Sequence, residues 1–527
     1  MDRVVIVLGR IALAIAVLSP LAGAAASLTG DRLQRYRRAT TLSWLGAAAA
    51  MLTVITVAIS GPFTASLGGA SPISLTANQL TATLLLLIVG VGGIVQSYSA
   101  RYLQADTSGP NFFAAASIVV AAMAVVSTST RISLLVIAWV IAGLAFVAVL
   151  RYRSDIPGMS ASAQRTLSIF AAGDLALVAA LALILAKVGD INLTSATSFR
   201  ISAARLGGPA VAVAALVAIA ALARSAQGPL GRWLPGTVAA PTPASALLHA
   251  GVVNGGGILL IRLGFLASGS AWVTAATFAV AAGTAIVASA AVTRKPDVKG
   301  ALVFSTMSQM GFMVAECTVG AYLAALIHLF GHALYKANLF LGSGSQVRRG
   351  GQPVAAPTTP SLGARAAASL GTSALAMAAS AEVPGALASR GAYLLLAFAG
   401  ATAFVAGWSW WGHRPPSMRA SALWVGIMLG TSSLYGLFIG GAGAWITPAI
   451  PAGGSGLLNP AWLLAVALGG IGIAAATRFS PARSRLTLLL LGLGTPPLPR
   501  LAPKAPRSGF NPASARPLSG SPAEGAA

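Results

Sequence analysis

The chain has 527 residues, of which 56% are hydrophobic, 8% are charged and only ten are acidic. Average soluble chains carry about 25% charged residues, so this composition excludes a water-soluble globular protein and indicates that lipid is the solvent for most of the surface. The net charge of +24 does not indicate nucleic-acid binding, because the basic residues fall in gaps between apolar runs rather than in an aromatic-lined patch.

The first apolar run covers 4–28 and follows Asp2 and Arg3. Its Ala-rich end resembles the cleavage site of a signal peptide, but the run is longer than the apolar core of a typical signal peptide. Many further apolar runs follow it. We therefore interpret 4–28 as the first membrane helix.

A helix needs about twenty apolar residues to cross the hydrocarbon core of a bilayer. On this criterion the sequence predicts about fifteen transmembrane helices, at 4–28, 41–60, 79–98, 113–128, 132–150, 166–187, 209–228, 241–268, 272–292, 301–318, 321–345, 365–381, 391–411, 420–446 and 461–477. The shorter run at 486–494 predicts an interfacial helix. The segment after Pro496 is rich in Pro, Arg and Ser, which predicts a disordered tail.

Basic residues cluster in alternate gaps between these runs. They follow the first, fifth, ninth, eleventh and thirteenth runs, at Arg32, Arg35, Arg37, Arg38, Arg151, Arg153, Arg165, Arg294, Lys295, Lys299, Arg348, Arg349, Arg414 and Arg419. The gaps at 61–78, 269–271 and 447–460 hold almost none, although Arg200 and Arg205 after the sixth run are exceptions. We expect an inner-membrane protein, and the positive-inside rule predicts its N-terminus outside and its C-terminus in the cytoplasm.

Ionisable side chains within membrane helices are costly, so each one is a candidate functional residue. The stronger candidates in this sequence are Asp174, Arg224, His249, His328, His332 and Lys336, and the weaker ones are Glu316 and Glu382.

His328, His332 and Lys336 recur every four residues and therefore share one face of a helix. Imidazole groups take up and release protons near neutral pH, and a desolvated lysine can join them in a relay. The stripe thus predicts a buried proton pathway. Two alternatives are a metal site, for which no fitting third ligand is near in the sequence, and histidines that are held by backbone carbonyls.

Arg224 lies late in an apolar run and is followed by prolines, which remove backbone donors and break helices, at Pro229, Pro235, Pro241 and Pro243. A broken helix at membrane depth is tolerated only where it lines a protein-filled or watery cavity. An ion pathway beside Arg224 and His249 would meet that condition. The glycines at 251 and 255–257 indicate close helix packing rather than a nucleotide-binding loop.

Several of these segments resemble the antiporter-like subunits of respiratory complex I and of Mrp antiporters. The resemblance covers 95–345 and includes Tyr98-Ser-Ala-Arg-Tyr, Gly173-Asp174, Arg224-Ser-Ala-Gln-Gly-Pro, Pro241-Thr-Pro-Ala-Ser-Ala-Leu-Leu-His249-Ala, Asp297-Val-Lys, Phe304-Ser-Thr-Met-Ser-Gln-Met-Gly and His328-Leu-Phe-Gly-His332-Ala-Leu-Tyr-Lys336.

The resemblance implies an all-α polytopic membrane fold of about 14–16 transmembrane helices, with broken helices and two inverted five-helix repeats. The implied parts are N-terminal helices at 1–112, a first repeat at 113–268, a second repeat at 269–411, C-terminal helices at 412–494 and a cytoplasmic tail at 495–527.

The resemblance also implies roles for individual residues. The central relay of the family matches His249, His328, His332 and Lys336, and a family carboxylate matches Asp174. Arg224 stands where the family has the lysine of the first broken helix. Because arginine does not readily release its proton, we expect Arg224 to be a fixed charge paired with Asp174.

The chain departs from the family at two positions. The family has a glutamate directly after the tryptophan of the fifth span, but Val140 follows Trp139 here. The lysine of the second broken helix has no counterpart in 365–400. These differences leave open the possibility that the chain is a degenerate scaffold, which anchors a partner protein without conducting protons.

The segments beginning at His249 and His332 are more similar to the DabB family, the membrane subunits of inorganic-carbon accumulation complexes. This resemblance implies a transporter subunit in which proton flow drives CO2 hydration by a large cytoplasmic DabA-like partner, itself similar to β-carbonic anhydrases. Zinc is then expected in the partner, and no cofactor is expected in this chain. The alternative is an antiporter-like subunit of a redox pump or of a Mrp-type cation/proton antiporter.

Overall fold

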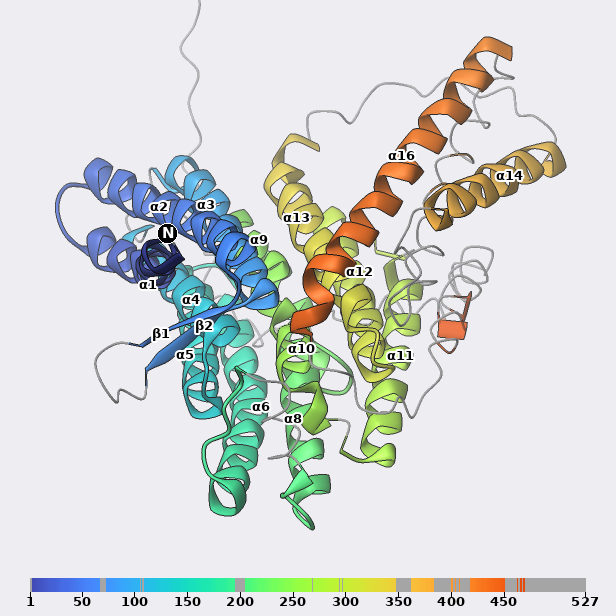
Figure 1. The fold of residues 1–527 in the computed structure, drawn as a ribbon. Coiled ribbons are helices and arrows are strands. Elements are labelled where there is room, and N and C mark those ends of the chain that lie inside the picture. The colour runs from blue at the N-terminus through green and yellow to red at the C-terminus, as the bar shows by residue number, and fades with distance from the viewer. Residues whose placement is uncertain are drawn as a thin grey trace, which may run out of the picture.

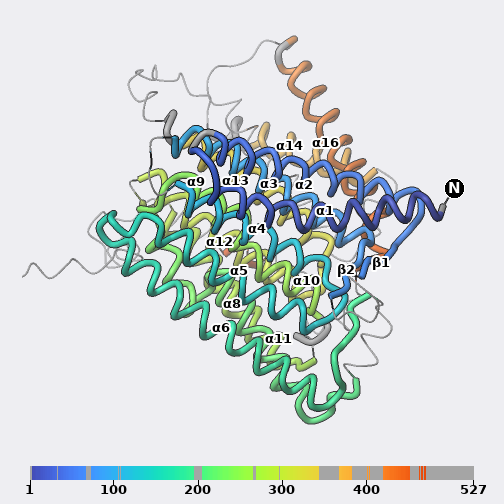
Figure 2. Tube along the Cα trace, turned by 90° about the vertical axis from the view of Figure 1, so that its left-hand side faces the viewer, coloured from blue at the N-terminus to red at the C-terminus, as the bar shows by residue number. Residues whose placement is uncertain are grey.

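The computed structural model describes residues 2–66, 73–104, 106, 109–194, 204–267, 269–292, 294–295, 297–346, 362–382 and 418–450, and the isolated positions 400, 403, 407, 462, 465, 466, 468 and 469. Nearly all of this part of the chain is helical, and the helices pack into one bundle (Figures 1 and 2).

The N-terminal helices form one side of the bundle, drawn in blue to cyan in Figure 1. They are α1 (Asp2–Leu28), α2 (Arg32–Ser60), α3 (Gln79–Tyr102) and α4 (Gly109–Thr128). Helix α1 packs against α2 and α4, and α2 packs against α3. Local sequence fixes the helix starts, because Asp31 and Asn78 accept hydrogen bonds from backbone N–H groups of the first turns of α2 and α3.

A small antiparallel hairpin connects α2 to α3. It consists of β1 (Phe63–Ser66) and β2 (Ser74–Ala77), with Phe63 opposite Ala77. Only a basic-poor loop was expected in this gap. The two strands satisfy each other's backbone groups in the segment between the helices, and the Thr130 backbone N–H donates to the Ser74 carbonyl at 3.0 Å.

The middle of the chain contains three helices followed by an interrupted stretch. The helices are α5 (Ile132–Arg151), α6 (Met159–Val188) and the shorter α8 (Ala210–Arg224). The interrupted stretch contains η1 (Leu230–Trp233), η2 (Pro235–Ala239), α9 (Thr242–Ala250), η3 (Val252–Asn254) and α10 (Gly255–Ala267). The predicted helix break after Arg224 is therefore present, and α8 covers only the first part of the expected run at 209–228.

The span predicted at 241–268 is present as an apolar stretch at Thr242–Gly264, but η3 divides it into α9 and α10. Close helix packing explains the glycines here. A Cβ atom at Gly256 would overlap the Ala221 carbonyl and the Ser225 hydroxyl of the preceding segment, and one at Gly257 would lie 2.8 Å from the sulfur of Met313. Glycine thus lets α10 approach its neighbours closely.

The remaining elements are α11 (Ala271–Val292), α12 (Val298–Thr318), α13 (Tyr322–Gln346), α14 (Leu362–Ala381), α16 (Met418–Ile446) and η5 (Thr447–Ala449). Helix α16 returns to the N-terminal part of the bundle, where the Trp445 indole N–H donates to the Thr83 hydroxyl at 3.1 Å. Predictions at 391–411, 461–477, 486–494 and 495–527 fall outside the described residues, apart from the isolated positions named above.

Nine helices in the described part of the chain are long and apolar enough to cross a membrane. Large apolar side chains also face outward from the bundle, including Trp272 at 84% exposure and Leu175 at 69%. Lipid is the solvent that suits such a surface. The predicted fold class, an all-α polytopic membrane protein, is confirmed.

Candidate functional site

The end of α8 places Arg224 inside the bundle. After Arg224 the chain leaves the helical path, and Ala226 has a positive φ of 56°. Side chains bond to backbone groups that the helix break leaves without helical partners. The Trp233 indole N–H donates to the Ala223 carbonyl at 3.0 Å, and the Thr284 hydroxyl accepts from the backbone N–H of Gly228 at 3.0 Å. These bonds allow the helix to end inside the bundle.

Arg224 is only 1% exposed and forms the expected ion pair with Asp174. Its Nη2 donates to Asp174 Oδ1 at 2.8 Å and to the Trp139 carbonyl at 3.3 Å. The guanidinium carbon lies 4.2 Å from the ring centroid of Trp139 and 4.4 Å from that of Phe170. Arg224 Nη1 is buried with no hydrogen-bond partner among the described residues.

The fifth helix contributes an indole to this site instead of a carboxylate. Trp139 Nε1 donates to Asp174 Oδ1 at 2.8 Å, so the carboxylate that pairs with the cation comes from α6. Helix α5 can approach this closely because it has glycine at 143. A Cβ atom there would lie 2.8 Å from Arg224 Nη2 and 3.1 Å from Asp174 Oδ2.

A second polar cluster lies between α9, α10, α12 and α13. Lys336 is fully buried, and its Nζ donates to the Ser305 hydroxyl at 2.9 Å and to the Leu302 carbonyl at 3.2 Å. The ring of His249 stacks on Phe340 with a centroid distance of 4.2 Å. Lys336 of the predicted stripe and His249 of α9 therefore belong to one buried region.

The two other histidines continue this cluster along α13. His332 Nδ1 lies 3.0 Å from Asn254 Oδ1, and His328 Nδ1 lies 2.9 Å from Glu316 Oε2. The rings of His328 and His332 are 6.5 Å apart between centroids. Neither histidine is held by a backbone carbonyl in the hydrogen bonds of the described residues, which argues against the purely structural alternative.

The two clusters lie next to each other at the break between α9 and α10. Asn254 pairs with His332, while a Cβ atom at the next residue, Gly255, would lie 3.2 Å from Arg224 Cγ and 3.4 Å from the Trp139 ring. Two consecutive residues of this break thus pack against the stripe of α13 and against the Arg224 side chain of the ion pair.

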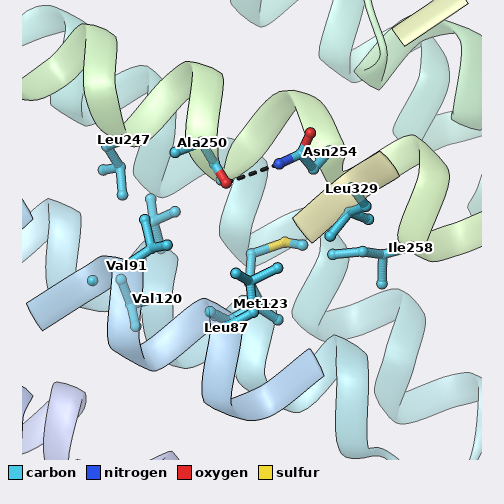
Figure 3. A pocket seen from close by; sticks show the side chains of 13 residues that line it. Leu87, Val91, Val120, Met123, Leu247, Ala250, Asn254, Ile258 and Leu329 are labelled. Atoms are coloured by element: carbon cyan, nitrogen blue, oxygen red, sulfur yellow. Dashed lines mark hydrogen bonds between the residues drawn. The ribbon is translucent and has the colours of Figure 1, made fainter. Parts of the chain in front are cut away.

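A small cavity of about 20 Å³ opens at the same break (Figure 3). Its walls are mainly apolar side chains of α3, α4, α9, α10 and α13. Asn254 is the polar side chain that reaches it, and its amide donates to the Ala250 carbonyl. This volume is enough for one water molecule. Close by, His332 Nε2 and His249 Nδ1 are buried without a hydrogen-bond partner among the described residues.

Sequence reasoning missed several contributors to the site. Trp139, Asn254 and Ser305 were not proposed as site residues, although each bonds directly to a predicted one. A signal existed for Asn254, the only amide side chain within its apolar run. Glu382, in contrast, is exposed in the turn that follows α14. The described residues contain no group of three or more His, Cys, Asp or Glu side chains that could share a metal ion.

A polytopic bundle with a broken helix and a buried row of ionisable side chains defines the chain as an antiporter-like membrane subunit. A family model described as NADH:quinone oxidoreductase/Mrp antiporter, transmembrane region, matches residues 129–405, and one described as complex I chain 5 N-terminus matches residues 66–113. The chain belongs to the NADH:quinone oxidoreductase/Mrp antiporter family.

Its relatives include two kinds of subunit. It is 36% identical over 291 residues to the probable inorganic carbon transporter subunit DabB1 of Halothiobacillus neapolitanus, and the aligned region covers 54% of this chain and 52% of that protein. It is 30% identical over 467 residues to NADH-quinone oxidoreductase subunit L of Mycobacterium tuberculosis, which covers 81% of this chain and 71% of that protein. The matched region thus spans about half the length of the first relative.

Solved structures share the fold. The Mrp complex from Dietzia sp. matches with a TM-score of 0.58 and 24% identity over 93% of this chain and 58% of that chain. A membrane-bound sulfane sulfur reductase, an archaeal respiratory membrane complex, matches with a TM-score of 0.58 and 18% identity over 92% of this chain and 96% of that chain. At these identities the likeness concerns the fold alone.

Proposed function

We propose that this chain is the proton-conducting membrane subunit of an energy-coupled inorganic-carbon accumulation complex. The proposed pathway consists of Asp174, Arg224, His249, His328, His332 and Lys336. The observation that carries the proposal is the buried connection between the Arg224–Asp174 pair and the histidine–lysine stripe through Asn254 and Gly255.

The chemistry of the row favours protons over metal cations. Hard cations such as alkali and alkaline-earth ions prefer oxygen ligands. The central groups here are three imidazoles and an ammonium, which carry protons on nitrogen. Two of the imidazole nitrogens are buried without a protein partner among the described residues. Protonated imidazole and neutral imidazole interconvert near neutral pH, which suits a relay at cellular pH.

Arg224 would act in this pathway as a fixed charge rather than as a proton carrier. Its pairing with Asp174 neutralises a buried cation near the stripe. If the pair loosens, the unbalanced positive charge repels a proton on the neighbouring histidines, and if it closes, that repulsion falls. Opening and closing of one ion pair would thus drive proton movement along α13.

The carbon-accumulation assignment is supported by the relatives named DabB, including those from Halothiobacillus neapolitanus and Bacillus subtilis. On this assignment CO2 hydration takes place on a large cytoplasmic zinc partner similar to β-carbonic anhydrases, and the chain itself is not an enzyme. The positive-inside rule supports an inner-membrane location with the N-terminus outside and the C-terminus in the cytoplasm.

Isolation of the native complex tests the proposal. The tagged chain is purified from its own membrane in mild detergent, its partners are identified, and bound zinc is measured. We expect one large soluble zinc-containing partner. Iron–sulfur proteins or several antiporter-like partners would contradict the carbon-accumulation role. They would support a redox pump or a Mrp-type antiporter, a second candidate that the long match to subunit L favours.

A further inference from the structure

We propose that Glu316 is an additional proton-carrying residue, and that with His328 it forms the site where protons join the pathway at one membrane face. The inference rests on the proposed proton conduction. It adds one residue to the pathway and states at which membrane face protons enter. It is carried by a carboxylate–imidazole pair: Glu316 Oε2 lies 2.9 Å from His328 Nδ1.

Burial distinguishes this pair from a surface salt bridge. The side chain of Glu316 is 5% exposed, whereas that of His328 is 21% exposed. A carboxylate this buried is costly unless it is paired, and its bond to an imidazole gives it a partner that can also exchange a proton.

The location of the pair fits the start of a pathway. Glu316 lies in the last turn of α12, which ends at Thr318, and His328 lies in the second turn of α13, which begins at Tyr322. Both therefore lie toward the membrane face where these helices meet. Lys336 is two helical turns deeper on α13, about 12 Å along its axis at the usual rise per residue.

The opposite end of α12 and α13 has lysines instead of a buried acid. Lys336 donates to Ser305 and Leu302 in the first half of α12, and Lys299 in its first turn donates to the Ala240 carbonyl at 2.9 Å. A buried acid thus lies at one end of the row and lysines lie toward the other. The sequence predicts that the lysine-rich end faces the cytoplasm, so Glu316 would receive protons from outside.

The proton step is balanced without any other reactant. Water reaches the pair on its more exposed side, at His328, and from there supplies a proton to the buried Glu316 carboxylate. The carboxyl group then passes a proton along the 2.9 Å hydrogen bond to His328 Nδ1. The resulting imidazolium releases its Nε2 proton toward His332, whose ring is 6.5 Å away between centroids. Rotation of the His328 ring or one bridging water spans that gap. The pair is then a carboxylate beside a neutral imidazole protonated at Nδ1. Before the next transfer the imidazole returns to the Nε2–H tautomer by losing the Nδ1 proton to water and regaining one at Nε2.

The test compares three variants of the full complex in vesicles that enclose a pH-sensitive dye. Glu316→Gln keeps a hydrogen-bonding amide but cannot carry a proton, Glu316→Asp keeps the carboxylate, and Asp155→Asn makes the same change at an exposed carboxylate. We expect Glu316→Gln to reduce proton flux at least about tenfold, as for loss of a positioned acid–base group. Glu316→Asp should retain measurable flux, and Asp155→Asn should conduct like the unaltered chain.

Chemical labelling of Glu316 distinguishes a proton-carrying carboxyl group from one that only holds α12 and α13 together. Dicyclohexylcarbodiimide modifies protonated carboxyl groups in apolar surroundings, so peptide mapping should find it on Glu316 of the unaltered complex. A Glu316→Gln complex that assembles and conducts at the unaltered rate would overturn this inference alone. If the unaltered complex and Lys336→Ala conduct equally, the proposed proton conduction fails, and this inference fails with it.

Discussion

Arg224 illustrates how one buried charge shapes its surroundings. Three aromatic or acidic groups from α5 and α6 enclose its guanidinium, and Asp174 supplies the counter-charge. Removing one partner of a buried ion pair typically costs about 3–5 kcal/mol. We therefore expect Arg224→Ala to lower both the thermal unfolding midpoint and proton flux. Arg224→Lys keeps the charge and should lose less of each. Equal flux in the two variants would contradict the fixed-charge role.

Substitution of Lys336 tests whether the chain conducts protons. Lys336→Met keeps the length of the buried side chain but removes the ammonium that bonds to Ser305 and Leu302. We expect proton flux to fall by at least about tenfold with little loss of assembly. The control is Tyr335→Phe, a change at the neighbouring residue, which is 55% exposed. Unchanged activity of Lys336→Met would instead support the scaffold alternative.

At the level of elements, a glycine decides how closely α5 approaches the ion pair. A methyl group at Gly143 would lie 2.8 Å from Arg224 Nη2 and force the guanidinium away from Asp174. Gly143→Ala should therefore reduce flux, measured in vesicles, while the helix itself gains propensity worth about 1 kcal/mol. Gly283→Ala in α11 is the matched control, because open space surrounds that position. Equal flux in both variants would show that the close approach of α5 has no role.

The same elements show what could be predicted from sequence. Apolar length predicted most described helices, and the proline cluster predicted a helix break after Arg224, because both are local properties. The division of α9 from α10 was not predicted, since a continuous apolar run hides a break made by tertiary packing. The bonds from Trp139 to Asp174 and from Asn254 to His332 join residues 35 and 78 positions apart, a distance that helical periodicity cannot resolve.

In the whole molecule, the two polar clusters form either one pathway or two. Asn254 and Gly255 connect them structurally, so we expect protons to cross the bundle by a single route that needs both Arg224 and His332. Groups that act as one unit show strongly non-additive losses. The double variant Arg224→Ala/His332→Gln should then conduct about as slowly as the slower single variant.

Two parallel routes would give a different pattern in the same vesicle assay. Each single variant would leave the other route open and retain a large share of the flux, and only the double variant would abolish it. Asn254→Leu separates the cases further, because it removes the amide that bonds to His332 while leaving both clusters in place. A single route predicts a loss in Asn254→Leu comparable to that in His332→Gln. Near-normal flux would mean that the connection at the α9–α10 break carries no protons.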